Sequence, residues 1–347
     1  MQQKLLSLAI AGALAIPGAA MADVQSKSGG DITIYGKMHA SYDVVDNSAT
    51  DDDTDDNTAA FRNTRLGFKG AEDLGNGLKG IWQVETQINT ADDNMDLRNT
   101  YVGLEGDSWG KILFGMHDTP YKAATAKLDL FSDTIADYNN IIGAHIVNSN
   151  TGLMASNFNE RENQIVGYVT PNFSGFQGAV ARESWQTDEA GNDEIEAWSV
   201  MGKYDQGPFF ASLAYELHRG AGVDGATAAA EIDAWKVGLG YSFGDSKVGF
   251  VYEDINHDLD DSTRSRDAFW GSFAHKFGAN ELKLAYGKAD ESEADNDDGA
   301  DTWAIGLDHN FSKRTKVYAI YTHMDNDAGA AYGLYTANNN GSGATGG

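Results

Sequence analysis

Residues able to perform covalent chemistry are few in this sequence, and their spacing does not suggest a catalytic site. The chain has no cysteine, and we predict no nucleophile elbow that would present an activated serine. Its 8 histidines are scattered, without the close pair that a metal site on one element would need. The acids Glu160 and Glu162 give only weak support for glycosidase chemistry. We therefore predict a protein that is not an enzyme and has no cofactor and no metal site.

Carboxylates dominate the charge of the chain. There are 52 Asp and Glu residues against 25 Lys and Arg, so the formal net charge is −27. This excess argues against nucleic acid as a partner, because nucleic-acid binding needs a basic surface. The acids gather in runs such as residues 51–56, and like-charged runs usually remain solvated. Carboxylate oxygens also suit divalent cations, but this run lacks the spacing of a calcium-binding loop.

The first 22 residues have the pattern of a secretory signal peptide. Lys4 precedes an apolar run over residues 5–20, and Ala20-Met21-Ala22 matches a cleavage site. We predict that residues 1–22 are removed and that residues 23–347 form one domain. The alternative is a retained N-terminal anchor, which is disfavoured because the run is short for a membrane helix.

Apolar and polar side chains alternate along several segments, and this period of two predicts β-strands. The pattern is clearest in residues 32–42, 82–88, 235–243, 281–286 and 302–311. It fits either a soluble sandwich with an apolar core or a membrane barrel with an apolar outer face. The export signal favours an all-β fold, a transmembrane antiparallel β-barrel, because closed barrels satisfy their backbone groups within lipid.

The alternation also predicts which side chains face the lumen of such a barrel. Lys37, His39, Arg65, Gln83 and Glu85 fall on the polar face of their segments. We expect His39 to line the lumen, where its protonation would influence conductance.

Short connections alternate with long polar ones, as in barrels with short periplasmic turns and long external loops. The longest connection covers residues 117–160, and loops of this length are usually functional or disordered. We count about fifteen strands, whereas bacterial single-chain barrels have an even number. Residues 338–347 are rich in Gly, Asn and Ser and supply no final strand. We therefore expect a sequence that is truncated at its C-terminus or closes in an unusual way.

Short motifs are spread over the whole predicted mature chain. They include Ile34-Tyr35-Gly36-Lys37, Arg65-Leu66-Gly67-Phe68-Lys69-Gly70, Arg98-Asn99-Thr100-Tyr101-Val102-Gly103-Leu104 and Thr170-Pro171-Asn172-Phe173-Ser174-Gly175-Phe176. In combination these motifs resemble those of the general trimeric porins of Gram-negative bacteria. The resemblance implies a barrel of 16 strands, a homotrimer, and a long third external loop folded inward to narrow the pore.

The resemblance also implies roles for charged residues at the constriction. Its basic wall would be formed by Lys37, Arg65, Arg98 and Arg161. Simple alternation turns Arg98 away from the lumen, so a bulge or a subunit interface would be needed there. The segment Leu128-Asp129-Leu130-Phe131-Ser132-Asp133-Thr134 resembles the acidic eyelet of the inward loop. Asp129 is the best match for the acid facing the basic wall, Asp133 is next, and Asp118 and Asp137 are weaker candidates.

These observations predict an outer-membrane porin that forms a water-filled channel for passive diffusion of small hydrophilic solutes and ions. External carboxylates should enrich cations at its mouth, which predicts mild cation selectivity. The expected partners are two further copies of the chain, outer-membrane lipid, lipopolysaccharide and the solutes. Three alternatives stay open: an outer-membrane enzyme, a channel specific for sugars, phosphate or short acids, and a surface-binding protein that uses the acidic loops.

Overall fold

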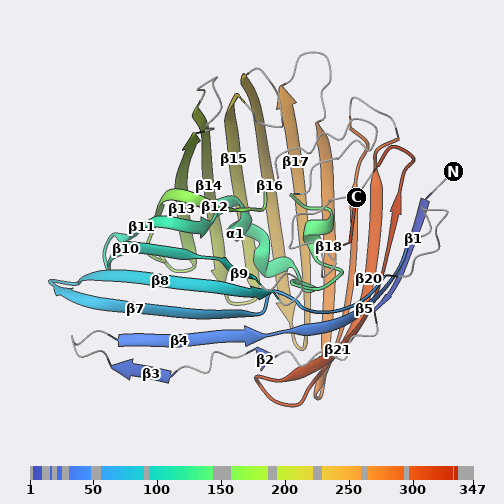
Figure 1. Cartoon of the computed structure of the whole chain (residues 1–347), viewed down its shortest axis with the longest axis horizontal. Helices are drawn as coiled ribbons and strands as arrows, with labels where there is room; N and C mark the ends of the chain where they lie inside the picture. The colour runs from blue at the N-terminus through green and yellow to red at the C-terminus, as the bar shows by residue number, and fades with distance from the viewer. Residues whose placement is uncertain are drawn as a thin grey trace.

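The protein is a single antiparallel sheet whose strands curve around an inward-folded loop (Figure 1). A computed structural model describes residues 3–9, 16–17, 22–25, 31–47, 56–89, 94–143, 158–186, 194–221, 229–258, 265–292, 297–330 and 332–334. Within these ranges no helix is long and apolar enough to cross a membrane. The acidic residues 51–55 lie outside the described part of the chain.

The described strands after residue 30 form fifteen runs, because three pairs of neighbours are separated only by short interruptions. These pairs are β4 (Asp31–Met38) with β5 (Ala40–Asn47), β6 (Asp56–Phe61) with β7 (Arg65–Gly75), and β9 (Asn94–Leu97) with β10 (Thr100–Gly106). The other strands are β8 (Leu78–Asn89), β11 (Gly110–Asp118), β12 (Arg161–Val169), β13 (Phe176–Gln186), β14 (Glu194–Gln206), β15 (Phe209–Ala221), β16 (Ala229–Phe243), β17 (Ser246–Asp258), β18 (Arg266–Phe277), β19 (Asn280–Ala289), β20 (Ala300–Asn310) and β21 (Lys316–Asn326).

Side chains alternate across this sheet as the sequence predicts. On β20, Trp303 and Ile305 are 41% and 42% exposed, whereas their neighbours Thr302 and Ala304 are both 2% exposed. The exposed apolar side chains recur on strands throughout the sheet, which is the outer face expected of a barrel in lipid. The fold prediction of a transmembrane antiparallel β-barrel is therefore confirmed.

The connections also alternate in length. Residues 76–77 link β7 to β8 in a tight turn in which Gly75, Asn76 and Gly77 all have positive φ. Glycine and asparagine tolerate this conformation best, which explains their use in a two-residue hairpin. At the opposite end of the strands the connections are longer, and the longest runs from β11 to β12.

The position between β21 and the first run is occupied by the N-terminal segment. β1 (Gln3–Ala9) pairs with β21 over its whole length and with β5 from Leu5 to Ser7. β2 (Ile16–Pro17) and β3 (Ala22–Gln25) pair with β4. These pairings join the two ends of the sheet, so residues predicted as signal peptide fill the place of the sixteenth strand. Cleavage after Ala22, which stays a prediction, would remove β1 and β2 from this seam.

The long loop between β11 and β12 lies inside the curve of the sheet (Figure 1). It contains the helix α1 (Pro120–Thr125) and the 3₁₀ turns η1 (Ala126–Leu128) and η2 (Tyr138–Asn140). Its apolar side chains Phe131 and Ile135 are buried against Trp270 and Ile320 of the far wall. The loop therefore folds inward, as the resemblance implied.

Candidate functional site

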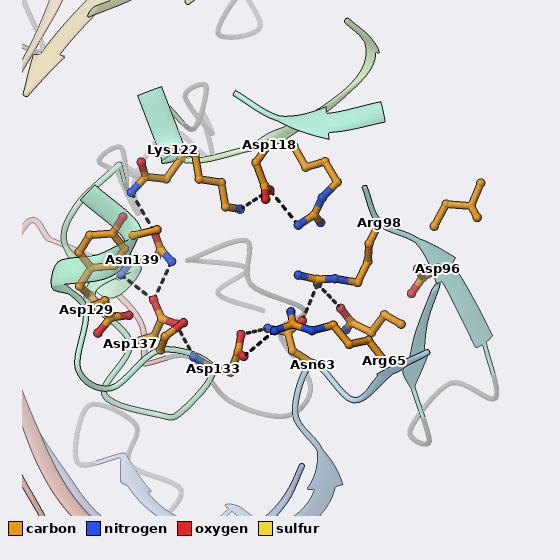
Figure 2. A pocket seen from close by; sticks show the side chains of 17 residues that line it. Asn63, Arg65, Asp96, Arg98, Asp118, Lys122, Asp129, Asp133, Asp137 and Asn139 are labelled. Atoms are coloured by element: carbon orange, nitrogen blue, oxygen red, sulfur yellow. Dashed lines mark hydrogen bonds and ion pairs between the residues drawn. The ribbon is translucent and has the colours of Figure 1, made fainter. Parts of the chain in front are cut away.

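A cavity of about 480 Å³ lies between the inward loop and the barrel wall (Figure 2). Charged and amide side chains dominate its lining, which comprises Asn63, Arg65, Gln87, Asp96, Leu97, Arg98, Asp118, Lys122, Ala126, Asp129, Ser132, Asp133, Asp137, Tyr138, Asn139, Asn159 and Arg161. Figure 2 shows Arg65 and Arg98 on the wall, opposite Asp133 and Asp137 of the loop. The cavity thus has opposite charges on its two sides.

Asp133 is the loop carboxylate that reaches the basic wall. Its Oδ2 lies 2.6 Å from Lys37 Nζ and 3.9 Å from an Arg65 nitrogen, and its Oδ1 accepts from Asn63 at 2.6 Å. A φ of 62° at Asp133 turns the chain sharply there. Burial alone would raise the pKa of this carboxyl, but the charges of Lys37 and Arg65 outweigh burial and lower the pKa to about 2. Asp133 is therefore a fixed negative charge.

Arg98 faces the cavity because the strand is interrupted beside it. Leu97 on β9 and Val102 on β10 are both exposed on the outer face, so the alternation changes phase between them. The Arg98 N–H donates to the Glu85 carbonyl at 2.8 Å, and its guanidinium donates to the Glu85 carboxylate, also at 2.8 Å. The same guanidinium donates to Asn63 at 2.9 Å.

Arg161 and Asp118 form a second ion pair where the loop leaves and rejoins the wall. Arg161 Nη2 lies 2.8 Å from Asp118 Oδ1, and Arg161 Nε donates to Asn99 at 2.7 Å. Lys122, on the first helix of the loop, lies 3.7 Å from the same carboxylate. Asp118 is thus held between two cations at the base of the loop.

Asp129 and Asp137 line the cavity, but their carboxylates bind the loop's own backbone. Asp129 accepts from the N–H of Phe131 at 2.8 Å, and Asp137 accepts from the N–H of Asn139 at 2.9 Å. Burial raises the pKa of Asp129 well above its ordinary value, and it raises the pKa of Asp137 to about 6. The structure thus places Asp133, rather than the expected Asp129, against the basic wall.

The three predicted lumen residues have the expected inward direction but differ in exposure. His39 is only 3% exposed, and its Nε2 lies 2.7 Å from the Tyr318 hydroxyl. This burial corrects the expectation that His39 lines the water, because its ring packs edge-on against Tyr318. Gln83 is partly exposed and donates to the Asn99 carbonyl at 3.0 Å, whereas Glu85 is buried beside Arg98.

Two residues that line the cavity were not predicted from the sequence. Asn63 connects Asp133 with Arg98, and its φ is 45° in the break between β6 and β7. The only signal for it is a polar asparagine where the alternation stops. Lys122 escaped because the loop's helix has no strand period to assign its direction.

Features that could suggest an enzyme do not form a catalytic group in the described residues. No three His, Asp or Glu side chains there are placed to hold a metal ion. Residues 106–110 do have the Gly-x-Ser-x-Gly spacing, but they form the turn between strands β10 and β11. A nucleophile elbow instead joins a strand to a helix, so this serine lacks that setting.

The pKa of Asp137 predicts a pH dependence of ion selectivity. Above about pH 6 this carboxyl is charged, and below it the cavity loses one negative charge while Asp133 stays ionised. We expect the cation-to-anion permeability ratio to fall as pH is lowered from about 7.5 to 5. Reversal potentials would measure it, and Asp137→Asn should weaken the pH dependence. An unchanged pH dependence in Asp137→Asn would contradict the assignment.

A barrel with an apolar outer face and a charged internal constriction defines the class of outer-membrane channel proteins. Comparison with known families agrees: the Gram-negative porin family matches residues 7–329, and the chain belongs to that family. Its place is the outer membrane, and membership of the family points to a channel rather than an enzyme.

Individual proteins are similar to this chain in sequence or in structure. Outer membrane porin protein 32 of Delftia acidovorans is 29% identical over 345 residues, covering 96% of this chain and 92% of the relative. The structure described as an anion-selective porin from Comamonas acidovorans has a TM-score of 0.74 at 24% identity, covering 88% of this chain and 92% of that one. The in-vitro folded trimer form of OmpT from Vibrio cholerae has a TM-score of 0.61 at 17% identity, covering 85% and 88%.

Proposed function

We propose that this porin is a passive channel for small hydrophilic solutes and ions, and that its constriction carries a transverse electric field. The observation that carries the proposal is the cavity in which Asp133 and Asp137 of the loop lie across from Arg98 of the wall (Figure 2). Charges fixed on opposite sides of a narrow passage orient polar solutes and hold water in place. An apolar solute would have to displace that ordered water, so it should pass more slowly.

Within the same proposal, the channel has a mild preference for cations. Support comes from the formal net charge of −27, which gives the mouth a negative potential at low salt. The comparisons do not favour this preference, because the Comamonas structure is described as anion-selective. Arg65, Arg98, Lys122 and Arg161 also give the cavity a substantial positive side. The ion preference is therefore a balance between an acidic exterior and a mixed constriction.

The proposed assembly is a homotrimer in contact with outer-membrane lipid and lipopolysaccharide. In this assembly each copy would carry its own pore, between its barrel wall and its inward loop. The trimer form of the Vibrio cholerae relative supports the number of copies. Native mass spectrometry of the detergent-extracted protein would measure it directly.

A liposome-swelling assay tests the diffusion function. Liposomes containing the folded protein should swell in isotonic solutions of small sugars, with rates that fall steadily as the sugar becomes larger. The control is the same preparation with heat-denatured protein. A rate that saturates for one solute, or is blocked by it, would instead indicate a solute-specific channel. No swelling with any solute would contradict diffusion through this cavity.

A further inference from the structure

Three glycines form a small depression on the inner wall opposite the constriction loop. Gly238 and Gly240 lie on β16 at positions that face the inside of the barrel. Gly249 on β17 pairs directly with Gly240. We call these three residues the glycine socket. Strand interiors rarely use glycine without a reason, because it weakens a strand and often marks a close approach by another segment.

The segment that approaches is Leu128, at the end of η1 in the constriction loop. A Cβ added at Gly240 would lie 3.0 Å from Leu128 Cδ2, its nearest neighbour. At Gly238 the added Cβ would lie 2.8 Å from Leu128 Cδ1, with Ser212 Oγ at 2.6 Å beside it, and at Gly249 it would lie 3.4 Å from Leu128 Cδ2, with Ser272 Oγ at 2.7 Å. Because carbon atoms prefer separations of about 3.5–4.0 Å, the leucine occupies space at all three glycines that a side chain on the wall would need, and it is the nearest atom at Gly240.

The backbone beside Leu128 is fixed to the same wall. The Ser272 hydroxyl donates to the Leu128 carbonyl at 3.0 Å, and Lys283 Nζ donates to the Leu130 carbonyl at 3.1 Å. Leu128 itself is only 5% exposed, so its side chain has little room to turn away. Replacing one of these glycines by a larger residue would therefore push the loop backbone into the lumen.

We propose that the glycine socket and Leu128 set the width of the pore, by fixing how far the constriction loop stands from the basic wall. Asp133 lies five residues after Leu128 in the loop, and its carboxylate forms the ion pair with Lys37. A shift of the loop at Leu128 moves that carboxylate and narrows the passage. The inference rests on the proposed diffusion function and names the residues that tune it; these are positioning residues.

The test compares single-channel conductance in folded variants. We expect Gly238→Ala to lower the conductance by roughly 1.5-fold, because the loop moves toward the lumen. Gly240→Ala should act in the same direction with a smaller effect, which keeps the test available if the first variant fails to fold. The matched control is Gly202→Ala on β14, where nothing lies within 4 Å of the added Cβ.

A second substitution that restores conductance distinguishes a change in pore width from general damage to the barrel. Adding Leu128→Ala to Gly240→Ala removes the atom nearest to the new methyl group, so the conductance should return close to the wild-type value. If the glycine variants conduct like wild type, or if Leu128→Ala fails to restore Gly240→Ala, the proposal is overturned. A wild-type protein that does not conduct would instead contradict the diffusion function itself.

Discussion

Glu253→Ala is expected to release the constriction loop from the barrel wall. The Glu253 side chain is fully buried on β17, where it accepts from the Tyr121 hydroxyl at 2.8 Å and from the Gly143 N–H at 2.7 Å. It thereby holds both ends of the described inward segment. Arg266, also fully buried, lies 3.5 Å from the same carboxylate.

The expected cost is large because the variant leaves the Arg266 guanidinium buried without this carboxylate. Breaking such a pair by removing one partner typically costs about 3–5 kcal/mol. The loop should then detach from the wall and move more freely within the lumen. This predicts noisier channel currents and new protease cleavage within residues 119–160. Glu196→Ala, at an exposed carboxylate bonded to Arg182, serves as the control and should change neither property. Unchanged cleavage in Glu253→Ala would show that Glu253 does not anchor the loop.

Asp133→Asn is expected to shift ion selectivity toward anions. The substitution removes a charge that the structure keeps ionised and leaves Lys37 and Arg65 unopposed by this carboxylate. We expect the cation-to-anion permeability ratio to fall about twofold at low salt, where screening is weakest. Reversal potentials in a salt gradient measure this ratio.

Asp129→Asn provides the matched comparison within the same loop. Both carboxylate oxygens of Asp129 accept backbone N–H groups of the loop itself, from Phe131 and Tyr138, so its replacement should change selectivity less than the replacement of Asp133. The asparagine oxygen can still accept from the Phe131 N–H. A larger shift in Asp129→Asn than in Asp133→Asn would mean that Asp129, as the sequence motif alone suggested, is the acid of the constriction.

The fold was largely predictable because a barrel in lipid imposes one rule on every strand. Trp303 and Ile305 alternate with Thr302 and Ala304 in the sequence, and the structure turns them to opposite faces. Strand closure was less predictable, because it depends on contacts between residues far apart in the sequence. The pairing of β1 with both β21 and β5 follows from no local pattern.

The wall of the site was more predictable than its loop. Lys37 on β4 and Arg65 on β7 lie close to strand breaks but keep the alternation of their own strands, so alternation alone gave their direction. Arg98 lies in the break between β9 and β10, where the phase changes and alternation gives the wrong face. Whether Asp129 or Asp133 faces the basic wall depends on turn conformations, such as the positive φ at Asp133. Turns have no regular alternation of side chains from which this direction could be predicted.

Single-channel recording of the wild-type protein in a planar bilayer with a salt gradient would show whether this barrel is a channel. We expect stepwise openings, grouped in threes, with a reversal potential that favours cations and weakens as salt rises. An anion-favouring reversal potential would leave the channel function in place and show that Arg65, Arg98 and Arg161 outweigh the acidic exterior. Correctly folded protein that inserts into the bilayer but never conducts would contradict the channel function.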